Sequence, residues 1–245
     1  PKALFATKLL KARANHRNLP EYLKYRYIAG EDTLFENVRQ LLPGHAMRVT
    51  VDRRGSHTYF DLRQTLNREK TKSEDLRLLL DAAVERWMIA DVQVGSLNSG
   101  GLDSSLISAR ASAISGVRLH TYNATYRDIS DQGYDESPFA LMLRDHIGSV
   151  HTEVGLGPDE YLQTLKRFTW YHDDPVTHPN SIPLFKMFRQ AREDGVIVLL
   201  SGEGADEVFC GYNGYTGIPI AWALRRVPGL ALLVRSLSGV LGHRR

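Results

Sequence analysis

The chain has 245 residues, of which 42% are hydrophobic and 24% are charged, a composition that suffices for one large domain or two modest ones. The net charge is only +3, and arginine and lysine are spread along most of the sequence, which argues against a nucleic-acid partner. The single cysteine, Cys210, excludes an internal disulfide and a thiolate metal cluster. We therefore expect a cytoplasmic protein in which Cys210 is a small packed residue.

Neither end of the chain predicts a membrane partner. Residues 1–15 alternate apolar side chains with lysine and arginine, unlike the continuous apolar core of a signal peptide. Residues 229–241 are the most apolar run, but Arg235 interrupts them and the run is shorter than the roughly 20 residues that span a bilayer. We expect this run to be a packing helix.

The first 60 residues are predicted to form a small β-rich unit. Residues 46–51 are rich in β-forming side chains, residues 52–55 have the composition of a turn, and residues 57–60 return, which predicts a hairpin. Residues 61–72 include a charged stretch that is typical of a linker. Residues 73–245 then form a second, larger domain.

The larger domain begins with an amphipathic helix from Ser73, because apolar residues recur at steps of three and four as far as Met88. Strand and helix patterns then alternate, which predicts an α/β fold with a doubly wound parallel sheet whose ligands bind beyond the carboxyl ends of the strands. Trp87, Trp222 and an apolar stripe over residues 161–168 are expected in the core. The predicted strands are residues 92–97, 119–126, 150–154 and 196–200, and the later helices are residues 104–112, 138–147 with Ser137 as cap, 159–168 and 182–194.

The first candidate site is the run Ser-Gly-Gly-Leu-Asp-Ser at residues 99–104, which joins a predicted strand to a predicted helix. Adjacent glycines let backbone amides approach a ligand, and the helix N-terminus favours an anion such as phosphate. Asp103 would repel phosphate unless Mg²⁺ bridges the two groups, so the run predicts a metal–nucleotide complex. The alternative is a structural glycine turn with serine caps.

The second candidate site is the run Ser-Gly-Glu-Gly-Ala-Asp-Glu at residues 201–207, directly after the apolar strand. Its glycines open the backbone, and its three carboxylates imply a nearby cation. We expect Asp206 to face Asp103 and to hold Mg²⁺ on the pyrophosphate part of ATP, while Glu203 points toward the reacting group. The alternative is that Glu203 and Asp206 only cap the next helix.

Both runs resemble a known family. Residues 99–104 match the pyrophosphate loop of N-type ATP pyrophosphatases, and residues 201–209 followed by Gly211 and Tyr212 resemble the second signature of asparagine synthetase B. Two such motifs in order are far more specific than either alone. Residues 33–45 also resemble the region that joins the glutaminase and synthetase domains of that family, so the resemblance runs from about Phe5 to Tyr212.

The resemblance implies a sheet of the adenine-nucleotide alpha-hydrolase (PP-loop) type, preceded by a remnant of a glutaminase domain. It implies that ATP and Mg²⁺ activate the carboxylate of aspartate with release of pyrophosphate, and that ammonia from glutamine then forms the amide. Glu203 would sit at the reacting centre, and Asp103 and Asp206 would hold the metal. The residues implied to bind ATP and its pyrophosphate are Leu97, Ser99, Gly100, Gly101, Asp103, Ser104, Ala124, Ser201 and Gly202.

The sequence departs from the family pattern at several points. The family's glutaminase nucleophile is an N-terminal cysteine, whereas this chain begins with Pro1, so we expect no glutamine hydrolysis by this chain. Relatives continue beyond the position of Arg245 into a helical region with a catalytic lysine, so we expect a fragment. Asn98 stands where relatives usually carry an aliphatic residue.

Three other functions stay open from the sequence. A family relative could use another acceptor, as in dipeptide amidation or in β-lactam or lasso-peptide cyclisation, and an inactive ATP-binding fragment is the alternative from another class. A tRNA-thiolating enzyme with the same loop is disfavoured, because it would be expected to show cysteines and basic patches. The expected partners are ATP, aspartate or a similar carboxylate, ammonia and a second copy of the chain in a homodimer.

Overall fold

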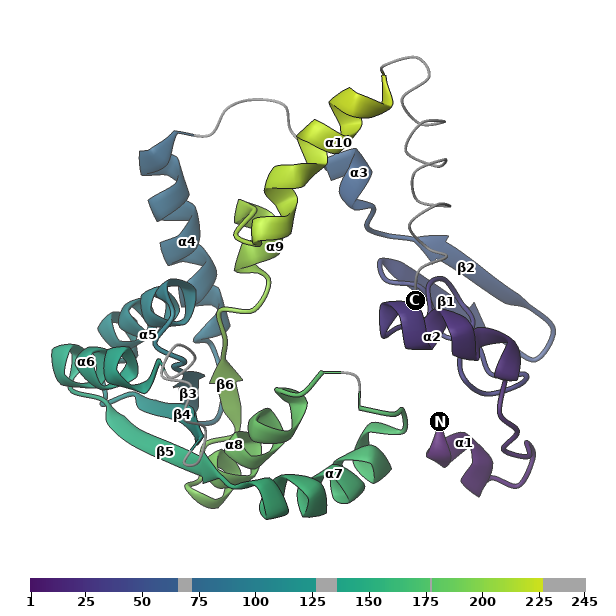
Figure 1. Ribbon diagram of the computed structural model, residues 1–245, viewed down its shortest axis with the longest axis horizontal. Helices are drawn as coiled ribbons and strands as arrows, with labels where there is room; N and C mark the ends of the chain where they lie inside the picture. Colours follow the sequence, from purple (N-terminus) through teal and green to yellow (C-terminus); the bar gives the residue numbers. More distant parts are fainter. Residues whose placement is uncertain (66–71, 127–135, 177, 227–245) are drawn as a thin grey trace, which may run out of the picture.

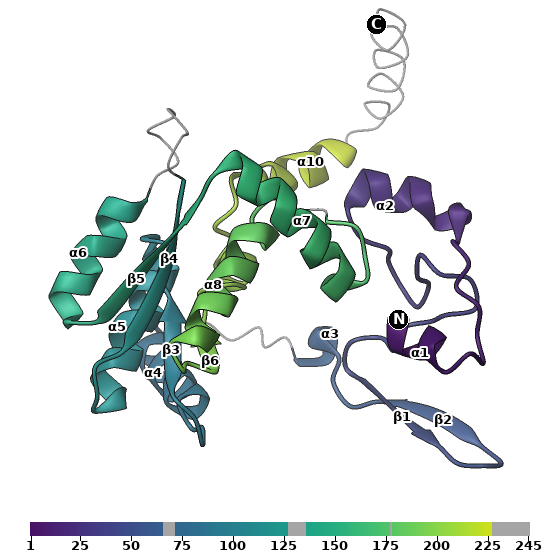
Figure 2. The same ribbon diagram turned by 90° about the horizontal axis from the view of Figure 1, so that it is seen from below.

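The computed structural model describes residues 1–65, 72–126, 136–176 and 178–226 (Figure 1). The part before residue 66 lies beside a larger α/β unit, and the two views in Figures 1 and 2 agree on this arrangement. The expected linker contains one short helix, α3 (Leu62–Thr65), and its next residues, 66–71, lie outside the described ranges, as does the expected packing helix at residues 229–241.

The N-terminal unit contains the predicted hairpin. Strands β1 (His45–Val49) and β2 (Arg54–Thr58) pair in antiparallel fashion, and residues 50–53 form the turn, so the second strand starts earlier than predicted. In the same unit lie α1 (Lys2–Ala6), the 3₁₀ helix η1 (His16–Asn18) and α2 (Leu19–Tyr25). Tyr22 and Val38 are its buried hydrophobic residues among those described, so this unit has little core of its own.

The α/β unit is built on a four-stranded parallel sheet, as predicted. Its strand order is β5-β4-β3-β6, so the chain moves outward from β3 to β5 and then returns to place β6 on the other side of β3. The loops that follow β3 and β6 therefore leave neighbouring strands at one edge of the sheet, where such folds bind ligands. The strands are β3 (Val94–Leu97), β4 (His120–Tyr126), β5 (Val150–Leu156) and β6 (Val198–Leu200).

Helices cover both faces of this sheet (Figure 2). Helices α4 (Ser73–Trp87), α5 (Leu102–Ser115) and α6 (Ser137–Ile147) lie on one face, where Val84, Ala111, Leu119 and Leu200 form a buried cluster. Helix α8 (Ser181–Glu193) lies on the other face over a second cluster, and α7 (Pro158–His172) packs against α8. The second cluster consists of Tyr122, Val154, Met187, Ala191 and Val196.

Several boundaries differ from the predicted ones by small amounts. The N-cap of α6 is Glu136, one residue before the expected cap, and Gly148 ends the helix in the left-handed region with φ 65°. Strand β6 starts at Val198, because the amide of Val196 donates to Ala191 O at the end of α8 and the chain joins the sheet only afterwards. The predicted order of strands and helices is nevertheless confirmed.

Several residues expected in the core are exposed instead. Trp87 is 72% exposed and Trp222 is 57% exposed, and Leu162 of the predicted α7 stripe is also exposed. Cys210 is exposed at the end of α9 (Ala205–Phe209), so the prediction that it is packed was wrong. The chain then runs through the 3₁₀ helix η2 (Asn213–Thr216) into α10 (Gly217–Arg225), and no helix within the described ranges could cross a membrane.

Candidate active site

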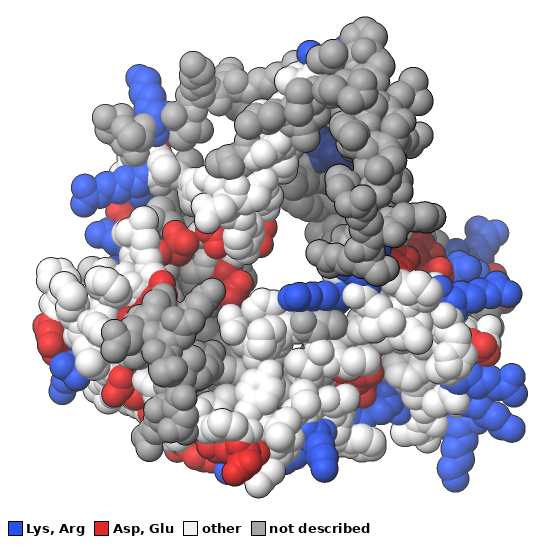
Figure 3. All heavy atoms as spheres, viewed as in Figure 1, with Lys and Arg blue, Asp and Glu red and all other residues white. Residues whose placement is uncertain are grey.

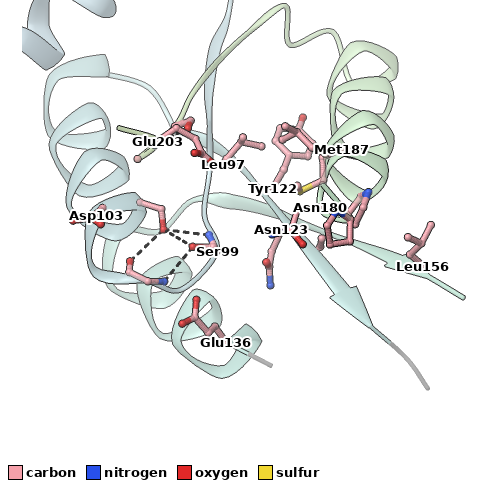
Figure 4. A pocket seen from close by; sticks show the side chains of 18 of the residues that line it. Leu97, Ser99, Asp103, Tyr122, Asn123, Glu136, Leu156, Asn180, Met187 and Glu203 are labelled. Carbon is pink, nitrogen blue, oxygen red and sulfur yellow. Dashed lines mark hydrogen bonds between the residues drawn. The ribbon is translucent and has the colours of Figure 1, made fainter. Parts of the chain in front are cut away.

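A cavity of about 880 Å³ lies at the carboxyl edge of the sheet, within the usual size range of small-molecule sites (Figure 4). It is bounded by the ends of β3, β4 and β5, by the loops after β3 and β6, and by α7 and α8. The lining residues are Leu97, Ser99, Gly101, Asp103, Ser104, Tyr122, Asn123, Ala124, Glu136, Leu156, Gly157, Pro158, Tyr161, Pro179, Asn180, Pro183, Leu184, Met187, Ser201, Gly202, Glu203, Gly204, Asp206 and Tyr212.

The cavity collects the residues that the sequence singled out, with one exception. Gly100 does not line it. At φ +90°, Gly100 turns toward α6, and an added Cβ would collide with the carbonyl oxygen of Glu136. Gly100 thus serves the tight turn that the glycine pair predicts, and its contact with pyrophosphate stays a prediction. The expected residues that line the cavity are Leu97, Ser99, Gly101, Asp103, Ser104, Ala124, Ser201, Gly202, Glu203 and Asp206.

The loop after β3 is held by its own serine hydroxyls (Figure 4). The Ser104 hydroxyl donates to Gly101 O at 3.2 Å and accepts from the amide of Ser99 at 3.3 Å. The two serine hydroxyls lie 2.9 Å apart, and Gly101 N donates to Ser99 Oγ. These hydrogen bonds give the loop a defined shape where it joins the start of α5. A defined loop is what the predicted phosphate site at residues 99–104 needs.

The loop after β6 touches the first turn of α5 at Gly202, directly after the loop that follows β3. A Cβ added at Gly202 would lie 2.7 Å from Ser104 N and 3.0 Å from Asp103 Cβ, so only glycine fits this contact. The Asp206 carboxylate lies against Gly211, and a side chain at position 211 would collide with it. The two sequence runs therefore form one site, and Asp103 and Asp206 line the same cavity.

The cavity is acidic. Four carboxylates line it, from Asp103, Glu136, Glu203 and Asp206, and none of its described lining residues is lysine or arginine. Figure 3 shows acidic side chains near the middle of the molecule, whereas basic side chains are frequent over the N-terminal unit. Within the described ranges, no group of three or more His, Cys, Asp or Glu side chains is placed to hold a metal ion. A phosphate ligand would therefore have to bring cations with it.

The residues on the cavity wall opposite the two loops were not predicted from the sequence. Tyr122 and Met187 lie there beside Asn180, across the cavity from Asp103 (Figure 4). Burial and a hydrogen bond from its hydroxyl to Asp194 raise the pKa of Tyr122, so its ring is a neutral apolar surface. The position of Tyr122 on a strand that ends at the site was the available signal, whereas α8 reaches the cavity only through tertiary packing.

The polar loop around residues 172–174 lies away from this cavity. Asp173 forms an ion pair with Lys2 at 2.6 Å, and this hydrogen bond lowers the pKa of Asp173 to about 2. His172 and Asp174 line a smaller cavity of about 220 Å³ between α7 and the N-terminal unit. The loop thus contacts the N-terminal unit.

Residues 75–244 match the family model for asparagine synthase. The chain belongs to this family. A putative glutamine-hydrolysing asparagine synthetase of Mycobacterium tuberculosis is 34% identical over 208 residues, which are 82% of this chain and 31% of the relative. Asparagine synthetase 1 of Bacillus subtilis is 30% identical over 227 residues, which are 91% of this chain and 35% of the relative. The chain thus spans about a third of the length of the curated asparagine synthetases it matches.

Solved structures show a weaker likeness. The NH3-dependent NAD synthetase of Campylobacter jejuni superposes with a TM-score of 0.40 at 13% identity, over 59% of this chain and 62% of that one. NMN synthetase of Francisella tularensis gives a TM-score of 0.39 at 16% identity, over 55% and 58% of the two chains. Scores this low carry no argument about the site.

Proposed function

We propose that this chain provides the nucleotide site of an ATP-dependent, amide-forming ligase of the asparagine synthase type. The observation that carries the proposal is the contact of Gly202 with Asp103 and Ser104, which joins both signature loops around one cavity. Family membership supports the same reaction class. The proposed acceptor is the side-chain carboxylate of aspartate, and the proposed nitrogen source is glutamine, because the two relatives are glutamine-hydrolysing asparagine synthetases.

The cavity fits ATP in size and in the distribution of polar groups. Leu97 and Ala124 line the apolar side of the cavity and pack against the buried cluster under α8. Adenosine would lie on this side. Ser99, Gly101 and Ser104 lie where the loop meets the N-terminus of α5, which has 14 residues and favours an anion. A Cβ added at Gly101 would meet only Ser99 Oγ and the Glu136 carboxylate, at 3.4 and 3.6 Å. The space in front of this glycine is thus open to a phosphate.

Mg²⁺ fits the donor set if phosphate oxygens complete its coordination. Mg²⁺ prefers oxygen ligands and commonly takes one or two carboxylates together with phosphates. Asp103 and Asp206, in the first turns of α5 and α9, would hold it. When bound, the ion would neutralise charge on the departing pyrophosphate.

The reaction has two steps. In the first, a carboxylate oxygen of the acceptor bonds to the α-phosphorus of ATP, the bond to the bridging oxygen breaks, and pyrophosphate leaves with that electron pair. In the second, ammonia attacks the acyl carbon, AMP leaves, and a proton is lost to give the amide. Glu203, exposed at the tip of its loop with its amide held by Ser201 Oγ at 2.9 Å, would orient the reacting groups or accept that proton.

The test is aspartate-dependent exchange of labelled pyrophosphate into ATP, measured on the full-length protein that contains this chain. Asp103→Asn and Asp206→Asn should each reduce the exchange by a factor of about 100 or more, the loss typical of removing one electrostatic group from a catalytic site. Asp145→Asn is the matched control, because Asp145 is exposed and pairs with its neighbour Arg144 on α6. Unchanged exchange in both site variants would refute the assignment.

The proposal also covers the cellular compartment, the metal and the assembly of the enzyme. A single cysteine, exposed and without a partner for an internal disulfide, is compatible with a reducing compartment, so we place the protein in the cytoplasm. Magnesium is the expected metal, and a homodimer is the expected assembly. Sedimentation of the full-length protein would test the assembly, and a monomer at all concentrations would contradict it.

A further inference from the structure

Asn98 is fully buried between the end of β3 and the glycine pair, and both ends of its side-chain amide are used. Its Nδ2 donates to Ala140 O on α6 at 3.0 Å, and its Oδ1 accepts from the amide of Gly100 at 3.3 Å. Its own backbone amide donates to Tyr122 O on β4 at 2.8 Å. Burying an amide without such partners would be costly, so these bonds define one orientation of the side chain.

These bonds fix how the loop sits on the first turn of α6. Gly100 packs so closely there that an added Cβ would lie 3.0 Å from Ala140 N and would collide with Glu136 O. The serine hydroxyl bonds join only residues within the loop and the start of α5. They hold the shape of the loop, whereas Asn98 links the loop to a neighbouring helix.

We propose that Asn98 is a positioning residue that sets the affinity of the site for the pyrophosphate part of its nucleotide. By fixing the Gly100 peptide against α6, Asn98 aims the opposite side of the loop, with Ser99, Gly101 and Ser104, into the cavity. The inference rests on the proposed function, because it presumes that this loop binds phosphate. Asn98 does not line the cavity, so its effect on a ligand passes through the backbone.

The experiment compares Asn98→Leu and Asn98→Ala with the wild type in the full-length protein. Titration calorimetry with magnesium pyrophosphate should show binding weakened about three- to ten-fold in both variants, the range that one lost hydrogen bond supports. Binding of adenosine should stay unchanged, because Leu97 and Ala124 keep their positions. Hydrogen exchange of residues 99–103 should become faster without ligand, because the Gly100 amide loses its acceptor.

Ser108→Ala is the matched control, since Ser108 is equally buried and its hydroxyl lies 2.8 Å from Ser96 Oγ on the sheet side of α5. It should lower thermal stability as the Asn98 variants do and leave pyrophosphate affinity unchanged. If both Asn98 variants bind magnesium pyrophosphate as the wild type does, or lose adenosine affinity equally, the inference is wrong. If the wild type binds neither ATP nor pyrophosphate, the proposed function itself fails.

Discussion

The loops after β3 and β6 meet at one cavity but are held in different ways. In the first loop, the side chains of Asn98, Ser99 and Ser104 make hydrogen bonds within the loop, to the start of α5 and to α6. In the second loop, residues 201–204, the amide of Glu203 donates to Ser201 Oγ. Its acidic tip, Glu203, is exposed, and the loop leans on the first one through Gly202.

This difference indicates that the two loops have different roles in binding. A loop that is fixed before the ligand arrives avoids ordering costs on binding, which suits a constant group such as phosphate. A less constrained loop that carries Glu203 and leads into Asp206 at the start of α9 can adjust to a cation and to the reacting acceptor. The comparison predicts that an added side chain destabilises the first loop more than the second.

The largest effect is expected at Gly100. Gly100→Ala should lower the free energy of unfolding by roughly 3 kcal/mol, because the positive φ costs about 1–2 kcal/mol and the collision with Glu136 O adds overpacking. Gly101→Ala is the matched control in the same loop, with ordinary contacts and φ −68°, and should stay within about 0.5 kcal/mol. Denaturant unfolding of both variants measures the difference. Equal losses would show that the loop is not fixed as described.

A smaller effect on stability is expected at Gly202, where the loops touch. Gly202→Ala should cost about 1–3 kcal/mol by overpacking against Ser104 N, and the displaced loops should weaken binding of magnesium–ATP at least ~10-fold. Gly214→Ala serves as the control, since a Cβ there meets no atom within 4 Å. Calorimetric titration and unfolding curves give the two readouts. If Gly202→Ala binds magnesium–ATP as tightly as the wild type, the two loops do not act as one site.

The smallest effect concerns the helix after the second loop. The Tyr212 hydroxyl donates to Glu207 Oε1 at 3.0 Å, and this bond raises the pKa of Tyr212 to about 12. Because the folded-state pKa exceeds the ordinary value of about 10, the contribution of this bond is fully present below pH 10 and is lost as the pH rises through about 12.

Tyrosinate absorbance during a pH titration measures this shift, with Tyr212→Phe identifying the signal. Glu207→Gln should move the titration of Tyr212 toward its ordinary range, since the carboxylate acceptor is gone. An unchanged titration in Glu207→Gln would show that the bond does not form in solution and that α9 is held by other contacts.

Much of the fold could be predicted because its signals are local. The alternation of strands and helices follows from apolar periodicity, and Gly148 ends α6 as a glycine cap is expected to. Trp87 and Trp222 show the limit of such patterns, because periodicity identifies an apolar face but does not say whether another element covers it. Both were expected to be buried and both are exposed.

The site could be predicted in part for the same reason. The residues that follow β3 and β6 carried their own glycine and carboxylate signals, and ten of the expected residues line the cavity. Glu136, Tyr161 and Met187 carried none, since they reach the cavity from helices or from a helix start. The close packing of Gly100 against the start of α6 could not be predicted, because Glu136 lies far along the chain.

The sequence by itself determined the chemistry that each loop offers: backbone freedom from glycine, hydroxyl donors from serine and negative charge from Asp103, Glu203 and Asp206. Only the tertiary structure decided that the loops meet, because the pairing of β3 with β6 depends on packing between distant segments of the chain. The contact of Gly202 with Ser104 and the bond from Asn98 to α6 arise from that packing. Local patterns cannot encode such neighbours, since they record sequence spacing and not distance in space.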